Sequence, residues 1–221
     1  MPEYKLTYFD IRGRAEFIRQ LFKLAGVPFE DNRLSYEQWP AVKHTTPFGQ
    51  MPVLEVDGKQ LCQTSAIGRY VAKQFVPLLL SLSLSLSLSP GFAGKTPFEE
   101  AWVDALADQA KDYFDELSPF IRAFRGVSSG DPEKLRVEIA EPARDKFFSL
   151  IEKRLKESKS GFLVGDNVTW IDLQLADHVD VMSGLLKGFM DAYPAVLAHR
   201  DRITQLPKLK DWIETRPKQN F

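Results

Sequence analysis

The stretch MPVLEVDGKQLCQTSAIGRYVAKQF, from Met51 to Phe75, combines two short apolar segments with a helical pattern. Asp57-Gly58 separates the two segments, and this dipeptide is the strongest short-range signal for a β-hairpin. Thr64 and Ser65 are candidate hydroxyl caps for the helix that follows. We therefore expect a strand, a tight turn, a second strand and a helix in this order.

The residues before Met51 predict a strand, a helix and another strand. YKLTYF (4–9) has period-2 character, and GRAEFIRQLFKLAG (13–26) carries apolar residues at helical spacing with Gly26 as its stop. PFEDNRLS (28–35) suits a short second strand. The order β-α-β followed by β-β-α predicts a small mixed sheet with helices.

The sequence after Pro90 predicts helices. Residues 96–124 form a long amphipathic pattern, and LPKLKDWIETRP (206–217) ends the chain with a short helix. Asp131-Pro132 is a good helix opening, and Pro142 predicts a kink or break within that helix. Thr169 and Asp172 have the spacing of a capping box. The predicted fold class is an α/β domain followed by an all-α domain.

A leucine–serine tract, VPLLLSLSLSLSLSP (76–90), separates these two regions. We predict an α/β domain over residues 1–75, a linker over 76–96 and a helical domain over 97–221. Alternation places the leucines on one face of a strand, which is an aggregation hazard because the tract has no charge. The tract is too short and too polar for a membrane span.

The composition is that of an ordinary globular protein. The 221 residues are 44% hydrophobic and 27% charged, and the formal net charge is −1. This balance gives no overall attraction to nucleic acid or to an anionic membrane, so neither is an expected partner. Cys62 is the single cysteine, which excludes an internal disulfide and favours a reducing, cytoplasmic location. Three scattered histidines lack metal-ligand spacing.

Four segments together resemble the cytosolic glutathione transferases. They are YKLTYFDIRGRAEFIRQLF (4–22), TTPFGQMPVLEVDG (45–58), QTSAIGRYVA (63–72) and FLVGDNVTWIDLQLAD (162–177). The subgroup that they resemble most is the sigma class, which includes haematopoietic prostaglandin D synthase. The resemblance implies a thioredoxin-like N-terminal domain, an all-helical C-terminal domain and a homodimer, with glutathione as co-substrate. It covers nearly the whole chain and marks residues 76–90 as an insertion.

The family's chemistry presents glutathione as a thiolate. Lowering a thiol pKa from ~8.5 to about 7 takes about 2 kcal/mol, which one hydrogen bond to a charged group supplies. The resemblance implies that Tyr8 donates this bond and that Arg14 adds positive potential. It assigns Gln63 and Thr64 to the γ-glutamyl end, and Trp39 and Lys43 to the glycyl end. The implied glutathione site comprises Tyr8, Arg14, Trp39, Lys43, Gly49, Gln50, Met51, Gln63, Thr64 and Asp112.

Two further features of this site follow from the resemblance. Pro52, after Met51, is expected to be cis, so that the main chain of Met51 pairs with the cysteinyl part of glutathione. Asp112 is expected to reach the γ-glutamyl amine bound to the partner subunit. Without the resemblance, each of these residues has an ordinary alternative as a packing side chain, a helix cap or a solvated charge.

The electrophile pocket is expected between the domains, lined by Phe9 and Phe114, with Phe120 as a third candidate. Asp108 and Asp112 lie one helical turn apart, but Lys111 interrupts this acidic pair, so we predict no metal.

The leading functional interpretation is a transferase, and so an enzyme, that conjugates glutathione to small hydrophobic electrophiles in detoxification, with peroxidase activity. One alternative is a glutathione-dependent prostaglandin isomerase that uses the same thiolate. The other is a non-catalytic binding protein on the same fold, like the related lens crystallins.

Overall fold

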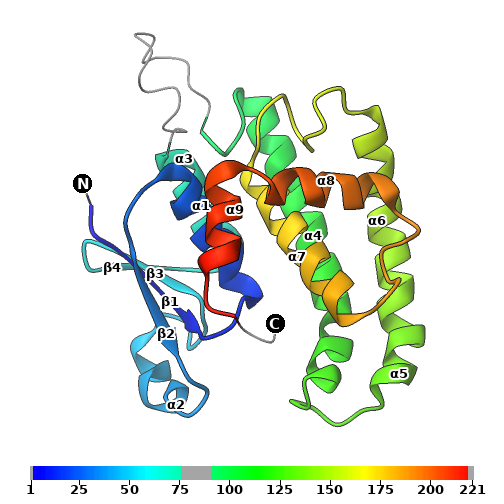
Figure 1. The fold of residues 1–221 in the computed structure, drawn as a ribbon. Coiled ribbons are helices and arrows are strands. Elements are labelled where there is room, and N and C mark those ends of the chain that lie inside the picture. Colours follow the sequence, from blue (N-terminus) through cyan, green and yellow to red (C-terminus); the bar gives the residue numbers. More distant parts are fainter. Residues whose placement is uncertain (1, 76–90, 219–221) are drawn as a thin grey trace.

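A computed structural model of the protein describes residues 2–75 and 91–218. The predicted Leu-Ser insertion, residues 76–90, lies outside the described residues. Figure 1 shows a small sheet with its helices at the left of the molecule and a group of longer helices at the right. The predicted order, an α/β domain followed by an all-α domain, is therefore confirmed. The two domains lie next to each other.

The sheet has four strands: β1 (Tyr4–Phe9), β2 (Glu30–Leu34), β3 (Val53–Val56) and β4 (Lys59–Cys62). Their order is β2-β1-β3-β4, with β1 and β2 parallel and the other two pairs antiparallel. Asp57 and Gly58 join β3 to β4 with φ angles of 49° and 77°. A two-residue type I′ hairpin requires both angles to be positive, so the predicted hairpin is confirmed.

The helical segments of this domain are η1 (Gly13–Ala15), α1 (Glu16–Ala25), α2 (Trp39–Val42), η2 (Lys43–Thr45) and α3 (Thr64–Gln74). Gly26 ends α1 in the left-handed conformation, as expected, and its N–H bonds the carbonyls of Phe22 and Lys23. The predicted capping of α3 by its hydroxyls is wrong. The N-cap is Gln63, and Thr64 and Ser65 are already helical residues, so their hydroxyls lie too far along the helix to cap it.

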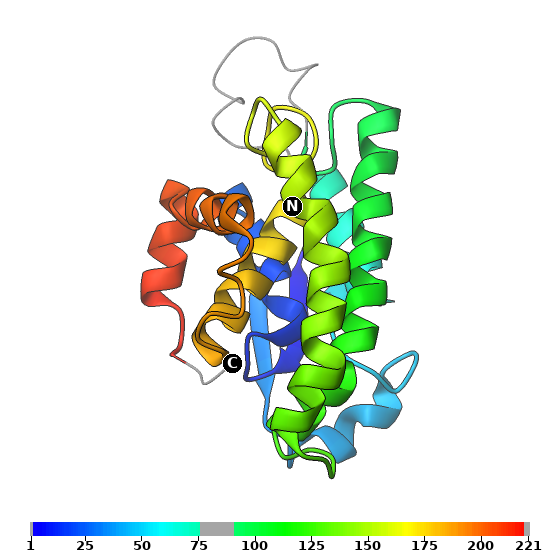
Figure 2. The same ribbon diagram turned by 90° about the vertical axis from the view of Figure 1, so that its right-hand side faces the viewer.

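The helical domain contains α4 (Pro97–Phe124), α5 (Pro132–Leu135), the π-helical segment η4 (Arg136–Ala140), α6 (Glu141–Glu157), α7 (Trp170–Leu185), α8 (Pro194–Thr204) and α9 (Pro207–Thr215). The long helices α4 and α6 run side by side (Figure 2). The helix does not break near Pro142; it continues from Pro132 to Glu157, and the predicted irregularity takes the form of the π-helical segment η4 directly before Pro142. Asp131 caps α5 through the N–H groups of Glu133 and Lys134. The sequence patterns above did not identify α8.

A buried carboxylate fixes the start of α7. The Asp172 Oδ2 atom accepts from the Thr169 N–H at 2.7 Å and from the Thr169 hydroxyl at 2.6 Å, which confirms the predicted capping box. The Oδ1 atom accepts from the Leu163 N–H at 2.9 Å and lies 2.8 Å from the His199 Nε2 atom. Asp172 therefore connects the start of α7 to the preceding loop and to α8.

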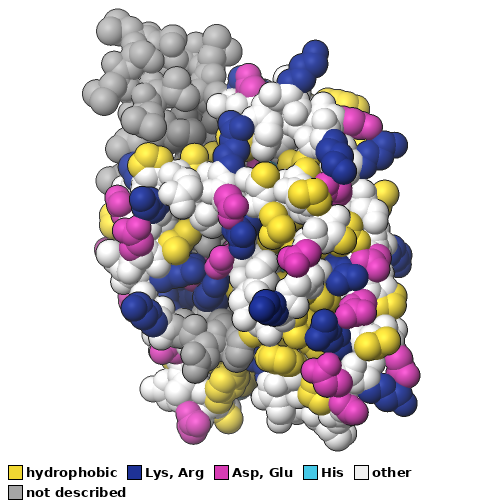
Figure 3. Space-filling view, turned by 45° about the vertical axis from the view of Figure 1, so that its right-hand side comes forward, with side chains coloured by type: hydrophobic (Ala, Val, Ile, Leu, Met, Phe, Trp, Pro, Cys, Tyr) yellow, Lys and Arg dark blue, Asp and Glu magenta, His cyan; other side chains and the backbone are white. Residues whose placement is uncertain are grey.

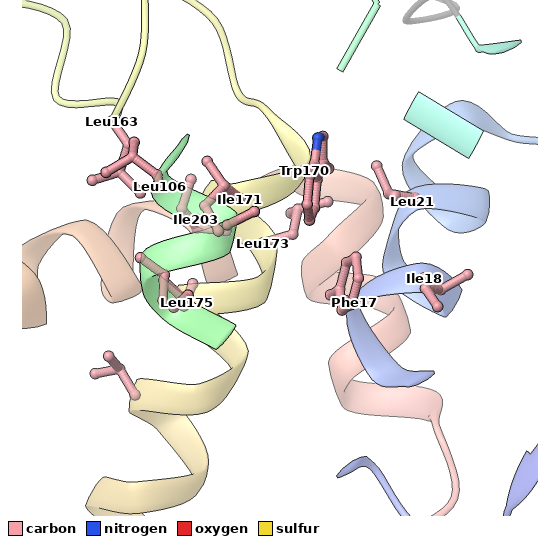
Figure 4. Packing of buried hydrophobic residues seen from close by; sticks show 14 of the residues in the cluster. Phe17, Ile18, Leu21, Leu106, Leu163, Trp170, Ile171, Leu173, Leu175 and Ile203 are labelled. Atoms are coloured by element: carbon pink, nitrogen blue, oxygen red, sulfur yellow. The ribbon is translucent and has the colours of Figure 1, made fainter. Parts of the chain in front are cut away.

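The two domains pack closely where α1 meets α7, with α9 beside α1 (Figure 1). Figure 4 shows Phe17 and Leu21 of α1 on the side of this helix that faces Trp170 of α7. The Phe17 and Trp170 rings are stacked with their centroids 5.9 Å apart. Gly68 of α3 makes this approach possible, because a Cβ atom there would lie 2.7 Å from the Phe17 ring and 3.2 Å from the Trp170 ring.

The molecular surface mixes both signs of charge. On the face that Figure 3 shows, Lys and Arg side chains are interspersed with Asp and Glu. None of the helices within residues 2–75 and 91–218 is both long and apolar enough to cross a membrane.

Candidate functional site

Tyr8 lies near the end of β1, with its side chain buried under the loop that leads to α1. Only 7% of the residue is exposed. Its hydroxyl oxygen accepts a hydrogen bond from the Arg14 N–H at 3.2 Å. Burial raises the pKa of Tyr8, against the opposing effects of this N–H and of the charges on Arg14 and Arg125. The phenol therefore keeps its proton at neutral pH and is a hydrogen-bond donor.

Gly13 allows the loop to close over Tyr8. Its φ angle is 45°, and a Cβ atom at this position would lie 2.9 Å from the Tyr8 hydroxyl oxygen. Both the left-handed backbone and the short distance therefore favour glycine. Arg14 follows at the start of η1, with 61% of its side chain exposed and its Nη2 atom 3.8 Å from Asp115 Oδ1.

Ion pairs and hydrogen bonds hold the same loop against the helical domain. The guanidinium of Arg12 pairs with Asp177 and, at 2.9 Å, with Asp180, both on α7. Glu16 at the start of α1 accepts from Trp212 Nε1 at 2.9 Å and from Arg216 Nη1 at 2.8 Å. These contacts fix the position of the segment that carries Tyr8 and Arg14 relative to α7 and α9.

The start of α3 supplies a second group of hydrogen-bond donors. Gln63 has a φ angle of 74°, an uncommon conformation for a residue other than glycine and one that concentrates at binding sites. Among the described residues, no protein group hydrogen-bonds the hydroxyls of Thr64 and Ser65, which line the same cavity as Tyr8. With the unpaired N–H groups of the helix start, these hydroxyls suit a carboxylate ligand.

The remaining predicted residues form a third group beside the sheet. Trp39 is half-buried, with its ring centroid 6.0 Å from that of Phe9, and Lys43 is exposed. A Cβ atom on Gly49 would lie 3.4 Å from Lys43 Cε, so the lysine stem lies against this glycine. The Met51–Pro52 peptide bond is cis, as expected.

One hydrogen bond connects this third group to the start of α3: Gln63 Nε2 donates to Gln50 Oε1 at 3.4 Å. This bond places the side chain of Gln50 beside that of Gln63. Trp39, Lys43, Gly49, Gln50 and Met51 lie outside the walls of the cavity that holds Tyr8.

This cavity lies between the two domains and has a volume of about 550 Å³. That size suits a small-molecule substrate. Tyr8, Arg14, Gln63 and Thr64 form one wall. The helical domain supplies both polar and apolar residues from α4 and α7, and the apolar ones are Phe114, Leu117, Ile121, Phe124, Val181, Met182 and Leu185.

Phe114 lines the cavity as expected, but the two other predicted phenylalanines do not. Phe9 follows Tyr8 on β1 and therefore points to the opposite face of the strand. Its ring packs against Tyr36, with the centroids 4.5 Å apart. Phe120 is 1% exposed and belongs to the core of the helical domain.

Sequence reasoning missed several polar residues of the cavity wall, among them Arg125, Gln174 and His178. His178 Nε2 lies 3.0 Å from the Tyr113 hydroxyl. Burial, with a smaller effect of Arg12, lowers the pKa of His178 to about 3, so its imidazole is neutral. The Oε1 atom of Gln174 is buried without a hydrogen-bond partner among the described residues. Gln174 and His178 are one helical turn apart on α7. This spacing was the only feature of the sequence that could have placed them together in the cavity wall.

Asp112 lies on an exposed part of α4, where Gln109 Nε2 donates to its Oδ2 atom at 3.4 Å. It is not part of the cavity wall, whereas Asp108 is. Over residues 2–75 and 91–218, His, Cys, Asp and Glu side chains form no group of three or more that could hold a metal ion. The absence of a metal from the working enzyme stays a prediction.

Two family models match this chain. The N-terminal domain of glutathione S-transferase matches residues 4–73, and the C-terminal domain of glutathione S-transferase matches residues 114–216. The chain belongs to the glutathione S-transferase family. The N-terminal domain of this transferase is accordingly thioredoxin-like, and its co-substrate is glutathione.

Relatives with known names agree with this assignment along the whole transferase. Glutathione S-transferase 1 of Ascaris suum is 47% identical, over the full length of both chains. A monomeric glutathione S-transferase from the hookworm Necator americanus is 50% identical, with a TM-score of 0.89 over 99% of this chain and all of that one. At these identities the comparison shows an enzyme of the same family.

The solved structures do not support the predicted sigma class. A Nu-class glutathione S-transferase from Haemonchus contortus is 47% identical, with a TM-score of 0.84 over the full length of both chains. A prostaglandin synthase D from Nilaparvata lugens is 34% identical, with a TM-score of 0.82 over 99% of this transferase and all of that chain. Membership of the family is therefore established, whereas the class within it is not.

Proposed function

We propose that this transferase activates glutathione as a thiolate through Tyr8 and adds it to small hydrophobic electrophiles. The observation that carries the proposal is the buried Tyr8 hydroxyl in the wall of the interdomain cavity. Its oxygen accepts from the Arg14 N–H, so its own hydrogen is free to point at a sulfur atom. Because burial raises the pKa of Tyr8, the residue acts as a donor and not as a base.

The stabilisation required is modest. A thiol pKa near ~8.5 must fall by about 1.5 units, which corresponds to about 2 kcal/mol. A hydrogen bond to a charged group contributes about 1.5–3 kcal/mol. Tyr8 alone therefore supplies most of the stabilisation, and the guanidinium of Arg14 adds to it because its positive charge lies beside the same hydroxyl.

The two ends of glutathione are each matched by a group of residues. We assign the γ-glutamyl carboxylate to the start of α3, where Gln63, Thr64 and Ser65 offer backbone N–H groups and unpaired hydroxyls. The glycyl carboxylate is assigned to Lys43 beside Trp39. Between them, the main chain of Met51, with Gly49 and Gln50, is assigned to the cysteinyl unit, which it pairs like an added strand.

The complete site is proposed to form in a homodimer, in which Asp112 reaches the γ-glutamyl amine bound to the partner subunit. The exposure of Asp112 and its position outside the wall of its own cavity support this assignment. We also propose the domain limits 1–75 and 97–221, with 76–96 as the linker and residues 76–90 as an insertion. The single cysteine, Cys62, favours the cytoplasm as the location of the enzyme.

Electrophile binding is assigned to the apolar walls from α4 and α7, including Phe114. Such walls favour small hydrophobic substrates. The same thiolate also suits peroxide reduction, in which two glutathione molecules become a disulfide while the peroxide yields an alcohol and water. We therefore propose detoxification as the role of the enzyme.

A second candidate is a glutathione-dependent prostaglandin isomerase. The similarity to the prostaglandin synthase D of Nilaparvata lugens favours this possibility. An isomerase returns glutathione unchanged, whereas a transferase consumes it. Measuring glutathione consumption with an endoperoxide and with an aryl halide therefore distinguishes the two activities.

Tyr8→Phe tests the leading proposal. The substitution removes one hydroxyl and keeps the ring, so glutathione should bind with unchanged affinity, measured by calorimetry with an S-alkyl analogue. The value of kcat/KM with a chromogenic aryl halide should fall by about 10- to 150-fold, which converts from 1.5–3 kcal/mol. Full activity with intact binding would contradict the proposed role of Tyr8.

A further inference from the structure

Arg125 occupies an unusual position at the end of α4. It caps this helix and lines the interdomain cavity next to Ile121 and Phe124. Its Nη2 atom donates to the Tyr36 hydroxyl at 2.6 Å, and the Tyr36 ring packs on Phe9. The guanidinium is thus held by the hydroxyl of a tyrosine from the other domain.

The other cations of the cavity wall have acidic neighbours. Arg69 pairs with Asp104 at 2.7 Å, Lys111 pairs with Asp115 at 2.6 Å, and Arg14 lies 3.8 Å from Asp115. Over residues 2–75 and 91–218, the guanidinium of Arg125 forms no ion pair, and the only hydrogen bond of this side chain goes to Tyr36. It therefore presents an uncompensated positive charge.

The positive charge of Arg125 lies in the wall of the interdomain cavity. Arg125 is half-buried, and it lines the same cavity as Tyr8. Apolar side chains also line this cavity, including Ile121 and Phe124 on α4 and Val181 and Leu185 on α7. An unpaired guanidinium next to such surfaces favours a ligand that brings a carboxylate together with an apolar body.

We propose that Arg125 binds a carboxylate on the second substrate, so that the electrophiles preferred by this enzyme are amphipathic acids. This inference rests on the proposed function above and names the substrate class of the same site. An activated double bond in the apolar body suits the thiolate. The sulfur forms a bond to the β-carbon, the π electrons move to the adjacent carbonyl as an enolate, and the enolate takes a proton from water.

The test compares an alkyl enone that carries a terminal carboxylate with its methyl ester. Arg125→Gln should lower kcat/KM for the acid by about 10-fold or more, because it removes a charge-assisted hydrogen bond. The ester should change by no more than about twofold, since it lacks the charge. Arg122→Gln is the matched control, because Arg122 lies exposed on the same helix and outside the cavity wall.

Tyr36→Phe adds an independent variant that leaves the charge in place. It removes the hydroxyl that fixes the guanidinium, so kcat/KM for the acid should fall by a smaller factor, about threefold. Calorimetry with decanoate, in the presence of an S-alkyl glutathione, reports binding without turnover. Arg125→Gln should weaken this binding about 10-fold, whereas Arg122→Gln should leave it unchanged.

Two results would overturn the proposal. Equal losses for the acid and the ester would mean that Arg125 acts on the thiolate through Tyr8. A raised KM for glutathione with an unchanged KM for the acid would assign Arg125 to the co-substrate. If the wild-type enzyme conjugated none of the electrophiles, the proposed function would fail, while the decanoate titration would still test the carboxylate site.

Discussion

Replacing Asp172 with alanine should destabilise the helical domain strongly, because this one buried carboxylate serves four donors. They are the Thr169 N–H, the Thr169 hydroxyl, the Leu163 N–H and the His199 Nε2 atom, at 2.7, 2.6, 2.9 and 2.8 Å. The hydroxyl and the imidazole can turn to other acceptors, whereas the two backbone N–H groups cannot. Each buried donor left without a partner costs about 1–3 kcal/mol.

The expected loss in the free energy of unfolding for Asp172→Ala is therefore about 3–5 kcal/mol, including the effect on His199. Thr169→Ala should lose about 1 kcal/mol, because the main chain keeps its bond to Asp172. The measurement is chemical denaturation followed by circular dichroism, with the protein concentration held fixed. An Asp172→Ala protein no less stable than Thr169→Ala, or within about 1 kcal/mol of wild type, would refute the reasoning.

Two further predictions concern packing and pH. Gly68→Ala should lower the free energy of unfolding by about 1–3 kcal/mol, because its Cβ atom would lie 2.7 Å from the Phe17 ring. Gly184→Ala on α7 is the control; nothing lies within 4 Å of its Cβ position, so the same chemical change should stabilise the protein by up to about 1 kcal/mol. Equal losses for the two variants would contradict the proposed close approach at Gly68. The folded-state pKa of His178, about 3, lies below its value of 6.5 in the unfolded chain. Unfolding therefore takes up a proton in this window, and stability should fall as the pH drops from 6.5, by up to about 1.4 kcal/mol per pH unit. The slope of the unfolding free energy against pH between pH 4.5 and 6.5 reports the number of protons taken up on unfolding, and His178→Gln should lower this number by about one. An unchanged slope would argue against a buried neutral histidine.

Local signals in the sequence predicted much of the fold. Asp57-Gly58 fixed the hairpin because two positive φ angles suit few other residue pairs, and Asp131 and Thr169 marked helix starts through their own side chains. The start of α3 was less predictable. Two hydroxyl residues suggested a side-chain cap, but the backbone of Gln63 adopts a φ angle of 74° and shifts the helix start by one residue.

The glutathione residues were predictable only through the resemblance to a family, and the cavity wall only in part. Phe9 was assigned to the cavity for its chemistry, although the pleat of β1 directs it away from Tyr8. Arg125 and His178 were missed because each enters the cavity through packing between α4, α7 and the N-terminal domain. Contacts over such separations leave no periodic pattern in a single sequence.

The pKa of the thiol of bound glutathione tests the central claim most directly. The ultraviolet absorbance of the thiolate, titrated in the binary complex, reports this pKa for the wild-type enzyme and for Tyr8→Phe. We expect a value near about 7 for wild type and a return towards about 8.5 for the variant, because the hydroxyl of Tyr8 stabilises the anion by about 2 kcal/mol. The same thiol pKa in both proteins would contradict the account.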